Sequence, residues 1–180
     1  MTHTVEKIGG TSMSDYEAVR DNIIRGPGNR NDLYQRIIVV SAYGGITNRL
    51  LEHKKSGQPG IFSLFADGMN DDSWRKALAQ LKTDILAINL NLFGEGELLE
   101  QANAYICERL DDAEQCLSDL QSLCRHGHFA LASHLATVQE MLASLGEAHS
   151  AWNTAALLRR DGVPARYVDL TCWRSRLKMV

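Results

Sequence analysis

The first glycine-rich loop of the chain combines groups that could hold a phosphate. Lys7 precedes the glycine pair Gly9 and Gly10, and Ser12 follows it. Glycine backbone N–H groups can approach phosphate oxygens closely, and the lysine ammonium is a mobile positive charge. Because the lysine comes before the glycines, the loop is not a Walker A motif. These residues alone leave two interpretations open, a phosphate loop or an ordinary strand-to-helix turn.

A second loop, residues 41–48 (SAYGGITN), places hydroxyl groups on both sides of a glycine pair. The hydroxyls belong to Ser41 and Thr47. Ligands of open α/β sheets bind at the carboxyl ends of the strands, and each loop follows a predicted strand. We therefore expect both loops to open on the same edge of the sheet. The alternatives are that Ser41 is an ordinary polar residue at a strand end and that Thr47 caps a helix.

Strands and helices alternate around these loops. Residues 4–8 are predicted to form a strand, and the S-x-x-E sequence at residues 14–17 predicts a capped helix start. The four β-branched residues 37–40 do not alternate with polar ones, which predicts a strand buried on both faces. A third strand is predicted at residues 165–169. Strands separated by helices favour an α/β layer architecture with parallel strands.

The middle of the chain is dominated by apolar residues at spacings of three and four, a pattern typical of amphipathic helices packed on each other. These stripes cover residues 74–92, 99–120 and 131–145. A fourth helix is predicted at about 147–161, with Gly162 as its cap. Three strands are few for a doubly wound sheet, and the sequence ends soon after the third. We therefore predict that residues 1–180 are the N-terminal portion of a larger, truncated domain.

The composition argues against several classes of function. The formal net charge is -3, from 19 basic and 22 acidic residues, which disfavours a nucleic-acid partner. No apolar run approaches the roughly 20 residues that span a bilayer, and the N-terminus lacks a secretory signal. We expect a cytoplasmic protein without membrane contact and with reduced cysteines. Cys124, His126 and His128 could in principle bind zinc. Because they lie in one predicted turn, and metal sites usually draw ligands from separate elements, no metal site is predicted.

Three motifs occur in the order in which aspartate kinases carry them. Residues 7–12 (KIGGTS) resemble the family signature K-F-G-G-T-S, with isoleucine in place of phenylalanine. Residues 40–48 (VSAYGGITN) resemble V-S-A-x-x-G-x-T-N, and residues 146–150 (GEAHS) resemble G-E-x-x-S. The similarity spans nearly the whole chain, and its middle is most similar to the aspartate kinases associated with ectoine synthesis. The resemblance implies a helix-rich, amino-acid-kinase-like α/β/α sandwich with a mainly parallel sheet, incomplete on its C-terminal side.

The resemblance implies an ATP-dependent kinase that converts L-aspartate to 4-phospho-L-aspartate, with Mg²⁺ bridging the phosphates. The implied phosphate-binding residues, the first of them also catalytic, are Lys7, Gly9, Gly10 and Ser12. The implied aspartate-binding residues are Ser41, Thr47 and Glu147, with the glutamate pairing the α-ammonium. The β-carboxylate of aspartate is already ionised at neutral pH, so positioning and cationic neutralisation lower the barrier without a general base. Apart from the resemblance, Glu147 could simply lie in the first turn of a helix, where the dipole favours carboxylates.

The sequence also departs from the family. The arginine that clamps aspartate, the G-R-G-G-S-D segment and the regulatory ACT domains are not found, although Arg174 or Arg176 could mimic the clamp. Two alternatives therefore stay open. One is another amino-acid kinase, such as a glutamate kinase, although the motifs favour aspartate. The other is a catalytically inactive fragment that associates through its helical stripes. A homo-oligomer is expected.

Overall fold

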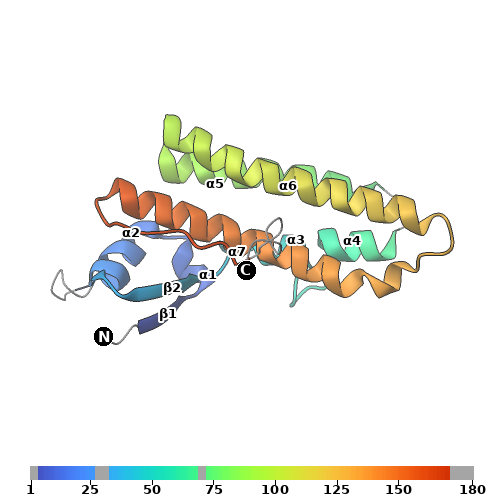
Figure 1. Cartoon of the computed structure of the whole chain (residues 1–180), viewed down its shortest axis with the longest axis horizontal. Coiled ribbons are helices and arrows are strands. Elements are labelled where there is room, and N and C mark those ends of the chain that lie inside the picture. Colours follow the sequence, from blue (N-terminus) through green and yellow to red (C-terminus); the bar gives the residue numbers. More distant parts are fainter. Residues whose placement is uncertain (1–3, 27–32, 69–71, 171–180) are drawn as a thin grey trace, which may run out of the picture.

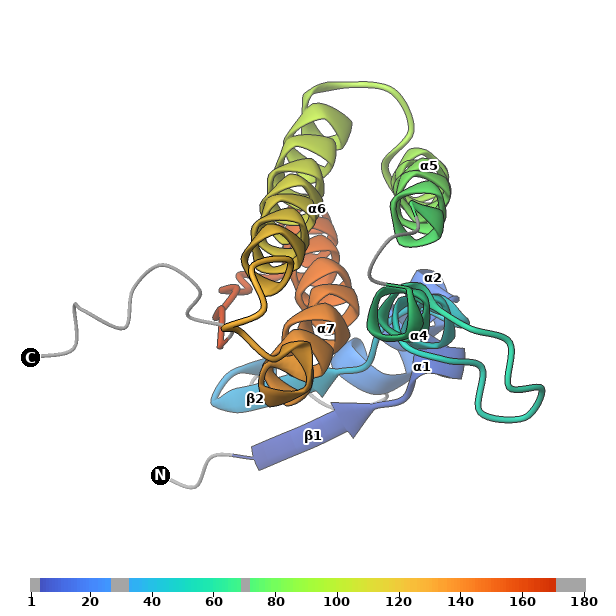
Figure 2. The ribbon, with the colours of Figure 1, turned by 90° about the vertical axis from the view of Figure 1, so that its right-hand side faces the viewer.

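The computed structural model shows long helices stacked over a small sheet. It describes residues 4–26, 33–68 and 72–170. Helix α7 (Leu135–Arg160) lies between the sheet and a pair of long helices, α5 (Ser73–Phe93) and α6 (Glu97–Cys124) (Figure 1). Figure 2 shows the same order from the end, with α6 above α7 and α7 above the strands. The predicted α/β class with parallel strands is confirmed.

The two strands of the sheet are the first two that the sequence predicts. Strand β1 (Thr4–Ile8) and strand β2 (Arg36–Val40) pair in parallel. Their last residues, Ile8 and Val40, lie opposite each other in the register. Because both strands end at the same level, the two glycine-rich loops leave the sheet side by side.

The prediction that β2 is buried on both faces is wrong. Ile37 is 54% exposed and Val39 is 45% exposed, while Ile38 on the opposite face packs against the core. The described helices cover only the face that carries Ile38. A run of β-branched residues without alternation therefore does not require burial of both faces of this strand. Helix α7 is one of the elements in contact with β2.

The helix predicted from the capping box is capped one residue later than expected, and a short helix precedes it. A single turn, α1 (Gly10–Met13), ends at Ser14, and helix α2 (Tyr16–Ala18) continues into the π-helix η1 (Val19–Arg25). The cap of α2 is Asp15, whose side chain accepts a hydrogen bond from the backbone N–H of Ala18 at 3.0 Å. Ser14 is already used as the C-terminal cap of α1, so it cannot cap the next helix. The predicted turn that follows, residues 26–29, lies outside the described residues after Gly26.

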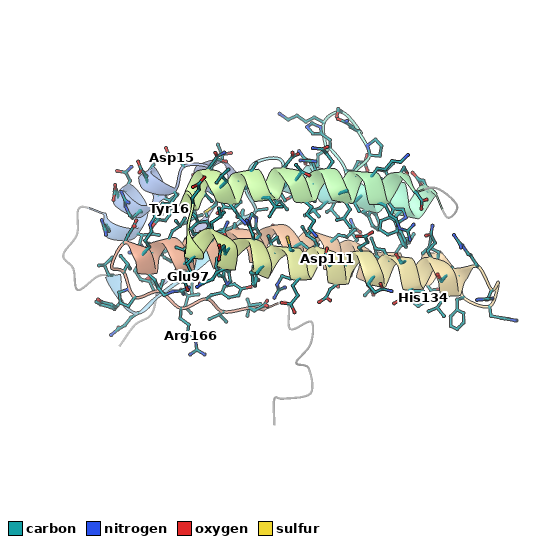
Figure 3. All side chains as sticks on the ribbon, turned by 90° about the horizontal axis from the view of Figure 1, so that it is seen from above. Asp15, Tyr16, Glu97, Asp111, His134 and Arg166 are labelled. Carbon is teal, nitrogen blue, oxygen red and sulfur yellow. The ribbon has the colours of Figure 1, made fainter. Side chains whose placement is uncertain are left out.

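Two short helices connect the sheet to the long ones. Helix α3 (Ile46–Leu50) follows the second glycine loop, and helix α4 (Ile61–Asp67) follows the break at residues 56–60. The first two predicted stripes are confirmed as α5 and α6. Figure 3 shows these two helices side by side. Lys82 Nζ of α5 donates a hydrogen bond to Asp111 Oδ1 of α6 at 2.6 Å. Within the described part of the chain, no helix combines the length and apolarity needed to span a bilayer.

The third and fourth predicted helices form one helix. After a short 3₁₀ turn, η3 (Leu131–Ser133), α7 runs without a break through Gly146 and Glu147 to Arg160. A single glycine inside a helix costs only about 1 kcal/mol, and packing against the loop after β2 offsets that cost. The predicted cap after the helix is confirmed in Gly162, which has a φ of 79°.

The predicted third strand does not form among the described residues. Residues 165–169 instead run along the helices without pairing to β1 or β2. The Tyr167 hydroxyl bonds to that of Tyr105 on α6, and Asp169 forms an ion pair with Arg109 of the same helix. A β-branched or aromatic segment becomes a strand only where a neighbouring backbone is available to pair, and side-chain contacts with α6 hold this one elsewhere.

Candidate functional site

The two glycine-rich loops are in direct contact. The backbone N–H of Ser41 donates to the carbonyl of Ile8 at 3.0 Å, which extends the strand pairing by one residue. A Cβ atom on Gly10 would lie 2.7 Å from the carbonyl oxygen of Ala42, closer than real Cβ atoms come. Glycine is therefore required at position 10 by the approach of the neighbouring loop. The expectation that both loops open on one edge of the sheet is confirmed.

The middle of α7 packs on the second loop at the same place. A Cβ atom on Gly146 would lie 2.7 Å from the Ala42 side chain and 3.3 Å from Ile46. One turn later, the Ser150 hydroxyl donates to the carbonyl of Ser41 at 2.8 Å. The G-E-A-H-S sequence of residues 146–150 therefore joins the helix to this loop at two points. A strand end, a glycine loop and a helix more than 100 residues away are thus brought into contact at one place.

Glu147 lies between these two contact points. It is the thirteenth residue of α7, so the alternative that it occupies the first turn of a helix is wrong. Its carboxylate oxygen Oε2 is buried and has no hydrogen-bond partner in the described structure. A buried carboxylate oxygen without a donor is costly, so native structures usually satisfy one. The arrangement fits a cationic ligand group.

The hydroxyl residues of the second loop have no capping role. The cap of α3 is Gly45, which has a φ of 84°, and no side chain bonds to that helix start. Thr47 is the second residue of α3, so the capping alternative is wrong for it. Ser41 and Thr47 are both half-buried. They flank the turn at Tyr43, whose carbonyl accepts a hydrogen bond from the Ile46 N–H at 3.1 Å.

The residues of the predicted phosphate loop lie at the carboxyl end of β1 and just beyond it. Lys7 and Ser12 are both exposed. A Cβ atom on Gly9 would have nothing within 4 Å, so the backbone of the loop faces open space at this residue. Helix α1 has only four residues, so its dipole is small, and the bare backbone of the glycines is the main feature that suits phosphate. Arg174 and Arg176, which could mimic the arginine that clamps aspartate in the family, lie outside the described residues.

A buried polar cluster beside this site was not predicted. Three fully buried residues, Asn89 of α5 with His149 and Asn153 of α7, are joined by hydrogen bonds. Burial lowers the pKa of His149 to about 4, so the imidazole is neutral at pH 7. One signal was available in the sequence, because Asn89 continues the apolar stripe of α5 at a core position.

The possible zinc ligands do not form a site. Cys124 is buried at the end of α6, while His126 and His128 are exposed in the turn after it. Among the residues that the structure describes, no group of three or more His, Cys, Asp and Glu side chains is placed to hold a metal ion.

Comparisons with known proteins place the chain in a family. The sequence model of the amino acid kinase family matches residues 3–176. The chain belongs to this family. A curated protein named aspartate kinase Ask_Ect, from Stutzerimonas stutzeri (strain A1501), is 55% identical over 172 residues. The matched region covers 96% of this chain and 36% of that kinase, so the chain spans about a third of its relative. No solved structure gave a significant match.

Proposed function

We propose that this amino acid kinase chain supplies the phosphate loop and the amino-acid pocket of an aspartate kinase. The observation that carries the proposal is the buried, unpaired Oε2 of Glu147, held between two contacts of α7 with a hydroxyl-bearing loop. The α-ammonium of an amino acid supplies the hydrogen-bond donors and the positive charge that this oxygen lacks. Ser41 and Thr47 would then bind the carboxylates of aspartate through their hydroxyls.

The phosphate end of the reaction is assigned to the first loop. Gly9 and Gly10 would hold the ATP phosphates through backbone N–H groups, assisted by the Ser12 hydroxyl. Lys7 would neutralise charge on the transferred phosphoryl group as the β-carboxylate approaches. Two anions must meet in this step, so positioning and positive charge are what the site has to provide. Mg²⁺ would enter with ATP and neutralise part of the phosphate charge, and no protein ligand is assigned to it.

Aspartate is favoured over glutamate as substrate by the three motifs and by the name of the curated relative. The alternative of an inactive fragment that associates through its helical stripes requires those stripes to be exposed. The stripes that would associate are already buried within one chain, with Trp74 and Leu117 both 0% exposed. A cytoplasmic location and homo-oligomeric assembly stay predictions.

Isothermal titration of the purified chain with L-aspartate, with and without Mg-ATP, tests the proposal. Glu147→Gln should weaken aspartate binding by about 1.5–3 kcal/mol, on the order of 10- to 150-fold, because a charged hydrogen bond to the ammonium is lost. Glu140→Gln, an exposed change on the same helix, is the matched control and should bind as the parent does. Equal binding by the two variants, or tighter binding of glutamate than aspartate, would contradict the assignment.

A further inference from the structure

A buried polar network borders the proposed aspartate site on the side of the long helices. Its members are Asn89 of α5, Asn103 of α6, and His149 and Asn153 of α7. His149 Nε2 lies 2.7 Å from Asn89 Oδ1, and Asn153 Nδ2 donates to the same oxygen at 2.8 Å. Asn89 Nδ2 in turn donates to Asn103 Oδ1 at 2.9 Å. The network therefore connects all three long helices at one level.

The hydrogen bonds define how the imidazole is protonated. His149 Nε2 lies 2.7 Å from Asn89 Oδ1, which can only accept, and 3.0 Å from Asn153 Nδ2, which can only donate. Because the shorter contact is the one with the acceptor, we assign the hydrogen to Nε2. The other nitrogen, Nδ1, is then an acceptor, and it has no hydrogen-bond partner among the described residues. Oδ1 of Asn153 likewise has no hydrogen-bond partner among the described residues. The neutral side chain thus has a fixed orientation, with its donor directed at α5.

The same imidazole also contacts the second glycine loop. Its ring meets the Tyr43 ring edge to face, with centroids 5.3 Å apart and an interplanar angle of 71°. Tyr43 is 6% exposed, and burial raises the pKa of its hydroxyl, with Asn153 partly opposing the rise. Since Tyr43 lies between Ser41 and Thr47, contacts run continuously from α5 through His149 to the loop that carries both hydroxyls.

Stability alone does not account for a polar network at this position. Buried polar atoms without partners reduce stability, and two atoms of this network have none in the described structure. Apolar side chains of similar size would fill the space without that cost. Hydrogen bonds, unlike apolar contacts, are directional, so the network selects one orientation of α7 against α5.

We propose that His149 is a positioning residue for amino-acid binding, which acts with Asn89 and Asn153 to hold the loop of residues 41–48 against the turn of α7 that carries Glu147. This inference rests on the proposed function. His149 itself contacts no substrate in this scheme. It sets the distance between the hydroxyls of the loop and the carboxylate of the helix, which must bind opposite ends of one small molecule.

Three variants separate positioning from simple loss of stability. His149→Leu removes the hydrogen bond and the ring contact, while His149→Gln keeps a donor near the place of Nε2. Leu117→Ala, in the core of α6 and 0% exposed, is a destabilised control outside the polar network. Aspartate affinity is measured by calorimetry and backbone hydrogen exchange by mass spectrometry. If His149→Leu does not fold, Asn89→Ala, which removes the acceptor and leaves the imidazole, takes its place.

We expect His149→Leu to bind aspartate about tenfold or more weakly, because a small misplacement of binding groups is costly. Its residues 41–48 should exchange faster, whereas His149→Gln and Leu117→Ala should match the parent in both respects. Parental affinity and parental exchange in His149→Leu would overturn the inference, as would an equal loss in Leu117→Ala. If the parent chain binds no aspartate, the proposed function fails, and the exchange of residues 41–48 still decides whether His149 positions the loop.

Discussion

Acidification should destabilise this chain through His149 in particular. Burial lowers the pKa of this imidazole to about 4 in the folded chain, against 6.5 as its ordinary value. Between these values the unfolded chain binds a proton that the folded chain does not, so stability falls as the pH drops from 7 toward 4. Below pH 4 both states are protonated and the difference stays constant. The stability that His149 contributes is therefore fully present only above about pH 6.5.

The size of the effect follows from the two pKa values. Each unit of separation corresponds to about 1.4 kcal/mol, so the full difference is about 3 kcal/mol and about 2 kcal/mol is lost between pH 7 and pH 5. His149 is 0% exposed, so solvent does not screen the effect. A loss of this size is a substantial part of the ~5–15 kcal/mol that stabilises a typical domain.

Urea unfolding followed by circular dichroism at pH 7, 6 and 5 measures this loss. His149→Gln is the matched variant, because glutamine is not titratable in this range and the other histidines contribute equally to both proteins. The parent should lose about 2 kcal/mol more than His149→Gln between pH 7 and pH 5. If the two proteins lose the same amount, the imidazole is not the group that titrates, and the argument from its burial is wrong.

Two further predictions concern packing and charge. Gly146→Ala should lower the melting temperature by several degrees, because its new methyl would lie 2.7 Å from the Ala42 side chain and overpacking costs about 1–3 kcal/mol. Gly9→Ala is the control and should leave the melting temperature unchanged, because a Cβ atom at Gly9 has open space around it. Asp161→Asn should destabilise the folded chain by about 1–2 kcal/mol at pH 7, as judged by urea unfolding. Burial alone would raise the pKa of Asp161, but hydrogen bonds led by those from Arg20 and Tyr16 lower it to about 2. The parent should therefore lose the stability that the ionised carboxylate contributes only as the pH falls from about 4 toward 2. Equal stability of the parent and Asp161→Asn at pH 7 would contradict this prediction.

Local patterns in the sequence were sufficient for much of the fold. The apolar segments beside the glycines predicted β1 and β2, and the spacing of apolar residues predicted α5 and α6. These features depend on residues that are close together along the chain, so periodicity and turn chemistry define them. The three motifs also predicted that Lys7, Ser41, Thr47 and Glu147 line one pocket, and both that pocket and the role of each residue stay predictions.

Other features were decided by contacts between distant residues. Whether residues 165–169 become a strand depends on a backbone neighbour, and the side chains of Tyr105 and Arg109 hold that segment against α6 instead. The need for glycine at position 146, in the middle of α7, comes from the side chain of Ala42, which lies more than 100 residues away along the chain. Asn89 and His149 are 60 residues apart, and only the packing of α5 on α7 brings them within 2.7 Å.

The sequence by itself determined the chemistry that the site can use, because glycine, lysine, hydroxyl and carboxylate groups are defined by residue type. The tertiary structure decided where those groups lie and which of them lack partners. Glu147 shows the difference most clearly. Its motif marks it as a candidate ligand residue, but only the packing of α7 on the loop after β2 shows a buried oxygen without a donor. Burial and hydrogen-bond satisfaction are properties of assembled elements, so no pattern of neighbouring residues can specify them.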